Sequence, residues 1–281
     1  MSLINFHNFS FRYKGNTDYA IKDINIEIEK NKFILLCGET GSGKTTLIRT
    51  LNGLIPQFYA GYYKGFVEVN GQNTEEISIA DLSTEVGIVF QNPENQLIAM
   101  NVEHEIVFGL ENLGFPSDEI SRRLKKSVRI TQIEHLLDKP PFELSGGEQQ
   151  RVAIASIIAL DPDILVLDEP TSLLDPFMAK RILELLNEIQ KKRDMTVIIS
   201  EHRMDLVLPF VDEIILMKKG RVFDQGEAHK IINGDKFQRV KINQPSIYRV
   251  FKNLKEKGLY ADKLPSSIPE AIKSLKQNTP I

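Results

Sequence analysis

The sequence predicts an α/β fold in which helices connect the strands of a parallel β-sheet. Four short runs are almost entirely apolar, which is typical of strands buried on both faces of such a sheet. These runs are residues 33–37, 86–90, 164–167 and 196–199. A long amphipathic stretch, residues 176–192, separates the last two runs and is predicted to be a helix. Strands that alternate with helices in this way favour a parallel sheet with helical crossovers.

Other segments predict strands of a different character. Residues 3–11 and 24–29 alternate apolar and polar side chains, which indicates strands exposed on one face. Residues 66–71 are predicted to form a strand and a turn. Residues 214–217 and 221–223 predict a final hairpin.

The apolar spacing becomes helical from Val102 to Leu137, where charged residues fill the gaps. This change predicts a helical subdomain inserted into the α/β core, over about residues 92–143. Beyond Gly234 the pattern weakens into Lys-rich helical stretches. We therefore expect a main domain over residues 1–235 and a C-terminal extension over residues 236–281.

The composition excludes several classes of protein. Hydrophobic residues make up 42% of the 281 residues, which is enough to bury a core. The single cysteine, Cys37, rules out an internal disulfide framework, and the net charge of −3 gives no support for nucleic-acid binding. The first residues lack the features of a signal peptide, and the apolar stretches are far shorter than the roughly 20 residues that span a bilayer. We expect a soluble, cytosolic protein.

A glycine-rich segment follows the apolar run at residues 33–37. It matches the phosphate-binding pattern of Gly, four residues, and Gly-Lys-Ser/Thr, with a strand before it and a helix after it. Backbone N–H groups in such a loop turn toward phosphate oxygens, and the helix dipole favours the anion. Lys44 is predicted to hold the β- and γ-phosphates, and Thr45 to offer its hydroxyl to Mg²⁺. The predicted nucleotide-binding residues of this segment are Gly38, Glu39, Thr40, Gly41, Ser42, Gly43, Lys44, Thr45 and Thr46.

Two carboxylates follow the apolar run at residues 164–167. The carboxyl ends of parallel strands are where open α/β sheets bind ligands. Asp168 is predicted to help hold Mg²⁺. Glu169 is predicted to polarise the water that attacks the γ-phosphate.

A second candidate anion site begins at Ser145, which is predicted to cap a helix. Gly146 and Gly147 would let the backbone approach an anion closely. Because one chain cannot easily use two such sites on one nucleotide, we expect two chains facing head to tail. The segment Leu-Ser-Gly-Gly-Glu-Gln-Gln-Arg at residues 144–151 resembles the signature motif of the ATP-binding-cassette (ABC) ATPases. The resemblance covers about residues 1–235 and implies a phosphate-loop NTPase core with an antiparallel β layer, an inserted helical subdomain and a small helical tail.

The resemblance assigns roles to further residues. Gln91 matches the glutamine that reports the nucleotide state to a partner and touches Mg²⁺ or the attacking water. His202 matches the histidine that contacts the γ-phosphate, and Asp175 lies in the loop that crosses the dimer interface. Tyr13 stands at the place of the aromatic residue that stacks on adenine, with Tyr19 as a rival.

Two runs narrow the resemblance to one branch of the family. Phe-Gln-Asn-Pro-Glu-Asn-Gln at residues 90–96 and Glu-His-Arg-Met-Asp at residues 201–205 look like the ATPase subunits of energy-coupling-factor (ECF) transporters. Residues 58–63 are also similar to this group, although a loop packed on the first strand layer explains them equally well. Such transporters import vitamins or transition-metal ions such as cobalt and nickel.

The ECF resemblance also implies cofactors, partners and a location. The cofactors are ATP and Mg²⁺, and the partners are a second ABC ATPase chain, an integral membrane scaffold and a substrate-capture subunit. The scaffold is expected to dock in the groove between the Gln91 loop and the helical subdomain. The chain is therefore expected on the cytoplasmic face of the cell membrane, held there through membrane subunits.

Two alternatives stay open. The chain could serve another ABC transporter class, such as a peptide or metal importer, or a non-transport task such as iron–sulfur assembly. The stretch between Gln91 and Leu144 is too short for the coiled coils of DNA-repair ATPases, and a single cassette disfavours a role in translation. A regulatory module without catalysis conflicts with the presence of Glu169 and His202.

Overall fold

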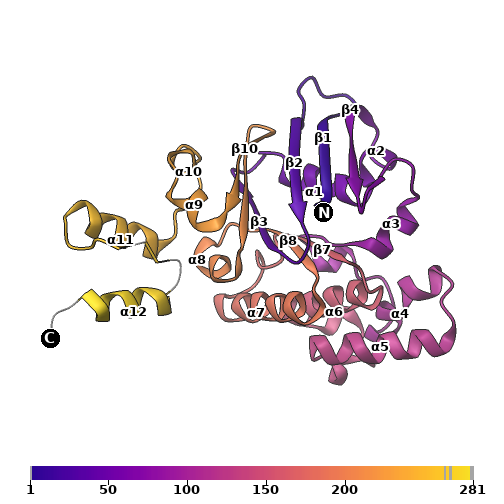
Figure 1. The fold of residues 1–281 in the computed structure, drawn as a ribbon. Coiled ribbons are helices and arrows are strands. Elements are labelled where there is room, and N and C mark those ends of the chain that lie inside the picture. The colour runs from indigo at the N-terminus through magenta and orange to yellow at the C-terminus, as the bar shows by residue number, and fades with distance from the viewer. Residues whose placement is uncertain (1, 263, 266–267, 279–281) are drawn as a thin grey trace.

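The computed structural model describes residues 2–262, 264–265 and 268–278 (Figure 1). The strands are β1 (Ser2–Tyr13), β2 (Ile21–Glu29), β3 (Phe33–Gly38), β4 (Gly61–Val69), β5 (Gln72–Asn73), β6 (Val86–Val89), β7 (Ile164–Asp168), β8 (Thr196–Ser200), β9 (Glu213–Lys218) and β10 (Arg221–Glu227). The α-helices are α1 (Lys44–Leu51), α2 (Leu54–Gln57), α3 (Ile79–Glu85), α4 (Val102–Asn112), α5 (Ser117–Thr131), α6 (Gly146–Ala159), α7 (Pro176–Arg193), α8 (Met204–Val207), α9 (Ala228–Asn233), α10 (Asp235–Gln238), α11 (Ser246–Glu256) and α12 (Ile268–Asn278). Short 3₁₀ turns are η1 (Pro93–Asn95), η2 (Glu134–Leu136), η3 (Pro141–Glu143) and η4 (Leu208–Phe210).

Two sheets form the centre of the molecule. The larger has the strand order β10-β9-β3-β8-β7-β6, in which only the edge strand β10 runs antiparallel to its neighbour. The smaller sheet is antiparallel and has the order β2-β1-β4-β5. The predicted α/β class is confirmed, and the predicted final hairpin is β9 and β10.

The apolar run in β3 is buried because the strand lies between two cores. Phe33 and Leu35 pack on the side of α7, whereas Ile34 and Leu36 face the antiparallel sheet. All four side chains are fully buried. Successive strand residues point to opposite faces, so a strand covered on both sides must be apolar throughout.

The strand β4 begins at Gly61, earlier than the predicted start at Phe66, so the alternative of a packed loop holds only for residues 58–60. The strand β1 continues to Tyr13 and pairs there with Gly61, which gives this segment a hydrogen-bonding partner. A side chain at position 61 would collide with the carbonyl oxygen of Arg12, so glycine permits the pairing. Tyr62 and Tyr63 are exposed, and apolar periodicity therefore did not reveal the strand.

The helices α4, α5 and α6 pack together at the lower right of Figure 1 around a core of their own. That core includes Leu110, Val128 and Val152. In contrast, Ala153 and Ile154 of α6 pack into the core on the α7 side of the large sheet. The helix α6 therefore packs both in the core of the three helices and in the core of the large sheet. This double packing fixes the N-terminus of α6 relative to the sheet.

The chain after Gly234 packs partly on the main core and partly in a small cluster of its own. Phe237, Val240 and Tyr248 belong to the core on the α7 side. Phe251 and Tyr260 belong to a separate small cluster, which includes residues of α11, the helix at the left of Figure 1. In the part of the chain that the structure describes, no helix combines the length and the apolar character needed to cross a bilayer.

Candidate nucleotide site

The carboxyl edge of the large sheet brings the predicted residues together. The glycine-rich loop follows β3, Gln91 follows β6, and Asp168 ends β7. Beside them lies a cleft of about 550 Å³, within the usual range for a small-molecule site. It is lined by Ala20, Thr40, Gly41, Gly43, Lys44, Thr45, Thr46, Gln91, Glu169 and His202.

The loop geometry depends on Gly43 and places Lys44 at the start of α1. Gly43 has a φ of 100°, and a side chain there would stand 2.6 Å from the carbonyl oxygen of Ala20. The buried Lys44 ammonium donates to the carbonyl oxygen of Gly38 over 3.1 Å. Burial lowers the pKa of Lys44, and the charges of Glu169 and Asp168 oppose this shift. The cleft therefore holds a cation at a helix N-terminus, an arrangement suited to phosphate.

Asp168 lies between two hydroxyl groups. Thr45 Oγ1 donates to Asp168 Oδ2 over 2.7 Å, and Ser200 Oγ donates to Oδ1 over 2.6 Å. Oxygen ligands of this kind are those that Mg²⁺ prefers, usually with one or two carboxylates and substrate phosphates completing the shell. Thr45, Asp168 and the amide of Gln91 line one space, so the donor set fits Mg²⁺.

Glu169 is the centre of a hydrogen-bonded group. Its Oε1 lies 2.9 Å from Nε2 of His202, and its Oε2 accepts a 3.0 Å hydrogen bond from Gln91. The backbone of Glu169 has a φ of 49°, a left-handed conformation that costs about 1 kcal/mol or more. Its N–H donates to the hydroxyl of Ser200 over 2.9 Å, which holds this conformation. Gln91 and His202, which are far apart in sequence, thus meet at the carboxylate of Glu169.

Four predicted residues lie away from this cleft. Ser145 and Gly146 are exposed at the N-terminus of α6, whereas Gly147 is buried. Ser145 forms the predicted helix cap as a capping box with Glu148. Asp175 is exposed and accepts hydrogen bonds from the first backbone N–H groups of α7. Within one chain these residues do not line the nucleotide cleft.

Tyr13 and Tyr19 occupy different environments. The Tyr13 ring is half-buried against Phe11, and its hydroxyl lies 3.3 Å from Thr46 Oγ1. The Tyr19 ring lies near the guanidinium of Arg12. The next residue in the sequence, Ala20, lines the cleft. Adenine stacking by Tyr13 stays a prediction.

Ser200 was not predicted from the sequence, although its hydroxyl bonds both acidic residues. It ends the buried strand β8, and in the sheet it pairs directly with Asp168 of β7. A polar residue that ends a buried strand two positions before His202 was the available signal.

A family model described as "ABC transporter" matches residues 21–172. An ABC transporter ATP-binding protein of Pyrococcus horikoshii is 41% identical over 260 residues, which are 92% of each chain. The energy-coupling factor transporter ATP-binding protein EcfA2 of Clostridium tetani is 35% identical over 278 residues, which are 97% of this chain and 96% of that protein.

Two solved structures share the fold. The structure of cbiO1 from Clostridium perfringens, part of the ABC transporter complex cbiONQ, has a TM-score of 0.75 and 33% identity, covering 92% of this chain and 97% of that one. The dimeric ATP-binding cassette MJ0796, in a post-hydrolysis state with ADP and Pi, has a TM-score of 0.69 and 26% identity. That match covers 80% of this chain and 98% of the cassette.

Proposed function

Because the chain belongs to the ABC transporter family, we propose that it is the ATPase subunit of an energy-coupling-factor importer for a vitamin or a transition-metal ion. As a member of this family it binds ATP and hydrolyses it in support of transport across a membrane. The likeness to EcfA2 and to cbiO1, each over more than nine-tenths of both chains, is the observation that carries the importer class.

The proposed mechanism assigns one task to each residue in the cleft. Lys44 and the backbone N–H groups of the loop bind the β- and γ-phosphates. Thr45, Asp168 and Gln91 would hold Mg²⁺, which would neutralise charge on the phosphate oxygens. Glu169 accepts a proton from the water that attacks the γ-phosphate.

His202 and Gln91 are proposed to position Glu169 and to contact the γ-phosphate. His202 Nε2 lies 2.9 Å from one oxygen of the Glu169 carboxylate, and Gln91 donates to the other oxygen over 3.0 Å. Binding of a γ-phosphate in the nucleotide cleft would draw the side chains of His202 and Gln91 toward the phosphate. The nucleotide state is thereby linked to Gln91, which stands on the outer surface.

We also propose a head-to-tail dimer that encloses two ATP molecules. Each nucleotide would lie between Lys44 of one chain and the N-terminus of α6, with Ser145, Gly146 and Gly147, of the other. Asp175 would lie at the interface. The likeness to a dimeric cassette supports this arrangement. Closure needs ATP because the γ-phosphate supplies a contact that the open state lacks.

The proposal also includes the domain organisation of the chain. Residues 1–235 would form the ATPase unit, residues 92–143 its helical subdomain, and residues 236–281 an appendage. A membrane scaffold and a substrate-capture subunit would hold the chain at the cytoplasmic face of the membrane.

Isolation of the complex from its native membrane tests this function. The tagged chain is purified in mild detergent, and the bound proteins are identified by mass spectrometry. Recovery of a multi-span scaffold with a small hydrophobic subunit is expected. Recovery of soluble proteins alone would contradict the importer function and leave the ATPase chemistry in place.

A further inference from the structure

Glu201 is a buried acid that directly precedes His202 and has no task in the mechanism proposed above. It is 3% exposed, whereas the side chain of His202 is 41% exposed. Burial of a carboxylate costs free energy unless hydrogen bonds replace the water that it loses. The structure supplies such hydrogen bonds to both oxygens of Glu201, so this carboxylate has one fixed position.

The Glu201 carboxylate joins two segments that are distant in sequence. Its Oε1 accepts hydrogen bonds from the backbone N–H groups of His202 and Arg203, over 2.9 and 3.0 Å. Its Oε2 accepts a short hydrogen bond from the hydroxyl of Thr171, which is fully buried. Hydrogen bonds to an ionised acceptor are roughly twice as strong as neutral ones. The carboxylate therefore holds the bend at His202 against the segment that begins at Thr171.

Arg203 makes a second connection between the same two segments. Its Nη1 donates to the carbonyl oxygen of Leu174 over 2.8 Å, and its Nη2 donates to that of Ser172 over a long 3.5 Å. The residues on both sides of His202 thus bond residues 171–175, the segment between β7 and α7. The backbone of His202 is held from two sides as a result.

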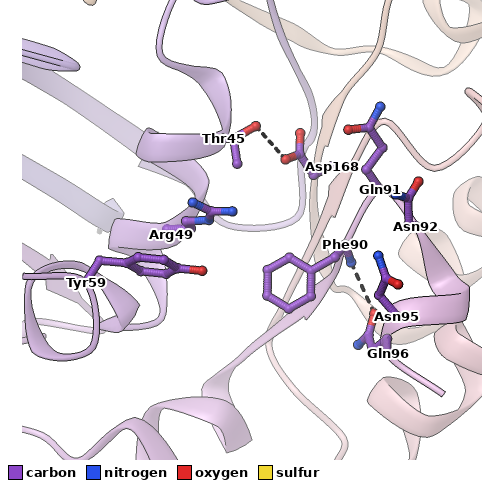
Figure 2. Close-up of a pocket in the computed structure, with 9 residues that line it drawn as sticks. All are labelled: Thr45, Arg49, Tyr59, Phe90, Gln91, Asn92, Asn95, Gln96 and Asp168. Carbon is purple, nitrogen blue, oxygen red and sulfur yellow. Dashed lines mark hydrogen bonds between the residues drawn. The ribbon is translucent and has the colours of Figure 1, made fainter. Parts of the chain in front are cut away.

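The position of the His202 ring depends on its backbone, because much of the ring is exposed. The ring meets Glu169, whose Oε1 lies 2.9 Å from Nε2. The residue before Glu169 is Asp168, which Figure 2 shows bonded to Thr45 in the space that Gln91 also lines. A shift of the His202 bend would separate the ring from Glu169. The same shift would leave the contacts in Figure 2 in place, so ATP binding and ATP hydrolysis should respond differently.

We propose that Glu201 is a positioning residue for ATP hydrolysis, because its carboxylate holds the bend at His202 against residues 171–175. This contact keeps the His202 ring beside the proposed base, Glu169. Arg203 supports the same contact from the other side of the bend. The inference rests on the proposed tasks of His202 and Glu169 and adds residues that act through the histidine. Glu201 does not line the nucleotide cleft, so its loss should lower kcat and leave ATP affinity almost unchanged.

The test measures kcat, ATP affinity and thermal unfolding of the purified chain and of the variants Glu201→Ala, Glu201→Gln and Thr171→Val. The amide oxygen of Glu201→Gln can still accept both backbone N–H groups, and Thr171→Val keeps the shape of the side chain while removing its hydroxyl. Glu105→Ala is the matched control. Glu105 is 6% exposed and likewise accepts two backbone N–H groups, those of Ile98 and Ala99.

Glu201→Ala and Thr171→Val are each expected to lower kcat about tenfold, with ATP affinity changed by less than about threefold. Glu201→Gln should keep kcat within about threefold of wild type, and Glu105→Ala within about twofold. In a chain that already carries His202→Ala, Glu201→Ala should lower kcat by less than about twofold more. The reason is that residues acting as one unit give losses that do not multiply.

Three results would overturn this inference alone. They are wild-type kcat in Glu201→Ala, an equal fall of kcat in Glu105→Ala, and losses that multiply when Glu201→Ala is combined with His202→Ala. If Glu201→Ala does not fold, Thr171→Val decides in the same way. If Glu169→Gln keeps wild-type turnover, the proposed base fails and this inference fails with it.

Discussion

The Nε2 atom of His202 lies 2.9 Å from Oε1 of Glu169, at the edge of the parallel sheet. The other oxygen of that carboxylate accepts a hydrogen bond from Gln91. The three residues follow β8, β7 and β6, so the order of strands in the sheet creates the contact. Any change that moves one strand end relative to the next should therefore alter ATP hydrolysis more than ATP binding.

Ser200 is the most direct test of this positioning. Replacing it by Ala removes the hydrogen bond that its hydroxyl donates to Asp168 Oδ1 and the one that it accepts from the N–H of Glu169. We expect kcat to fall about tenfold to a hundredfold, because small displacements of catalytic groups carry large costs in rate. ATP affinity should change by less than about threefold, since Ser200 does not line the nucleotide cleft. Ser83→Ala is the control, because the exposed Ser83 hydroxyl bonds the nearby carbonyl oxygen of Ala80. An equal loss of affinity and kcat would contradict a positioning role.

The capping box at the start of α6 should make stability depend on pH. The hydrogen bond from the Ser145 hydroxyl is the main cause that lowers the pKa of Glu148 below its usual 4.5. A carboxylate with a lowered pKa stabilises the fold above the usual value, and this contribution is lost as the pH falls through the lowered pKa. Glu148→Ala should cost about 1 kcal/mol at pH 7, measured by urea unfolding, and progressively less below pH 4.5.

Glu143→Ala, an exposed acid in the preceding turn, is the control for this variant. A stability difference between wild type and Glu148→Ala that stayed constant with pH would show that the carboxylate charge does not matter.

Cys37 should be inert in the native protein. It is 1% exposed in β3, and burial raises its pKa to about 12, with Lys44 opposing the shift. A thiol that is both buried and protonated reacts poorly with electrophiles. We expect no labelling by a thiol reagent at pH 8 and complete labelling in guanidinium. The chain has one cysteine, so each reading reports this residue. Native labelling within minutes would contradict the packing of β3.

The start of α11 is tied to the helix that follows His202. Both the N–H and the hydroxyl of Ser246 donate to the carboxylate of Asp205, over 2.7 and 3.0 Å. Asp205→Ala should free this end and raise the rate of tryptic cleavage after Arg249 several-fold, as the local opening free energy falls by about 1 kcal/mol. The cleavage site is identified by mass spectrometry, with the exposed Asp18→Ala as control. Unchanged cleavage would mean that other contacts hold the tail.

The parts that could be predicted are those in which local pattern determines structure. The buried run at β3 and the glycine-rich loop after it give strand, turn and helix in sequence order, and the structure has them there. The same holds for the cap at Ser145, where Ser and Glu three residues apart specify a helix start.

The parts that could not be predicted depend on contacts between distant segments. Ser200 matters only because the register of β7 and β8 sets it opposite Asp168. Likewise, the Tyr59 ring meets the Arg49 guanidinium only because of the turn after α2. Neither register nor such tertiary contacts follow from periodicity in one segment.

The central claim is that Glu169 activates water, and the steady-state ATPase rate of Glu169→Gln tests it most directly. Glutamine keeps the shape of the side chain but cannot accept the proton. We expect turnover to fall at least about a hundredfold, while ATP still binds and produces a stable closed dimer. The exposed Glu184→Gln should hydrolyse ATP as wild type does. Undiminished hydrolysis by Glu169→Gln would contradict the assignment of the base and the mechanism built on it.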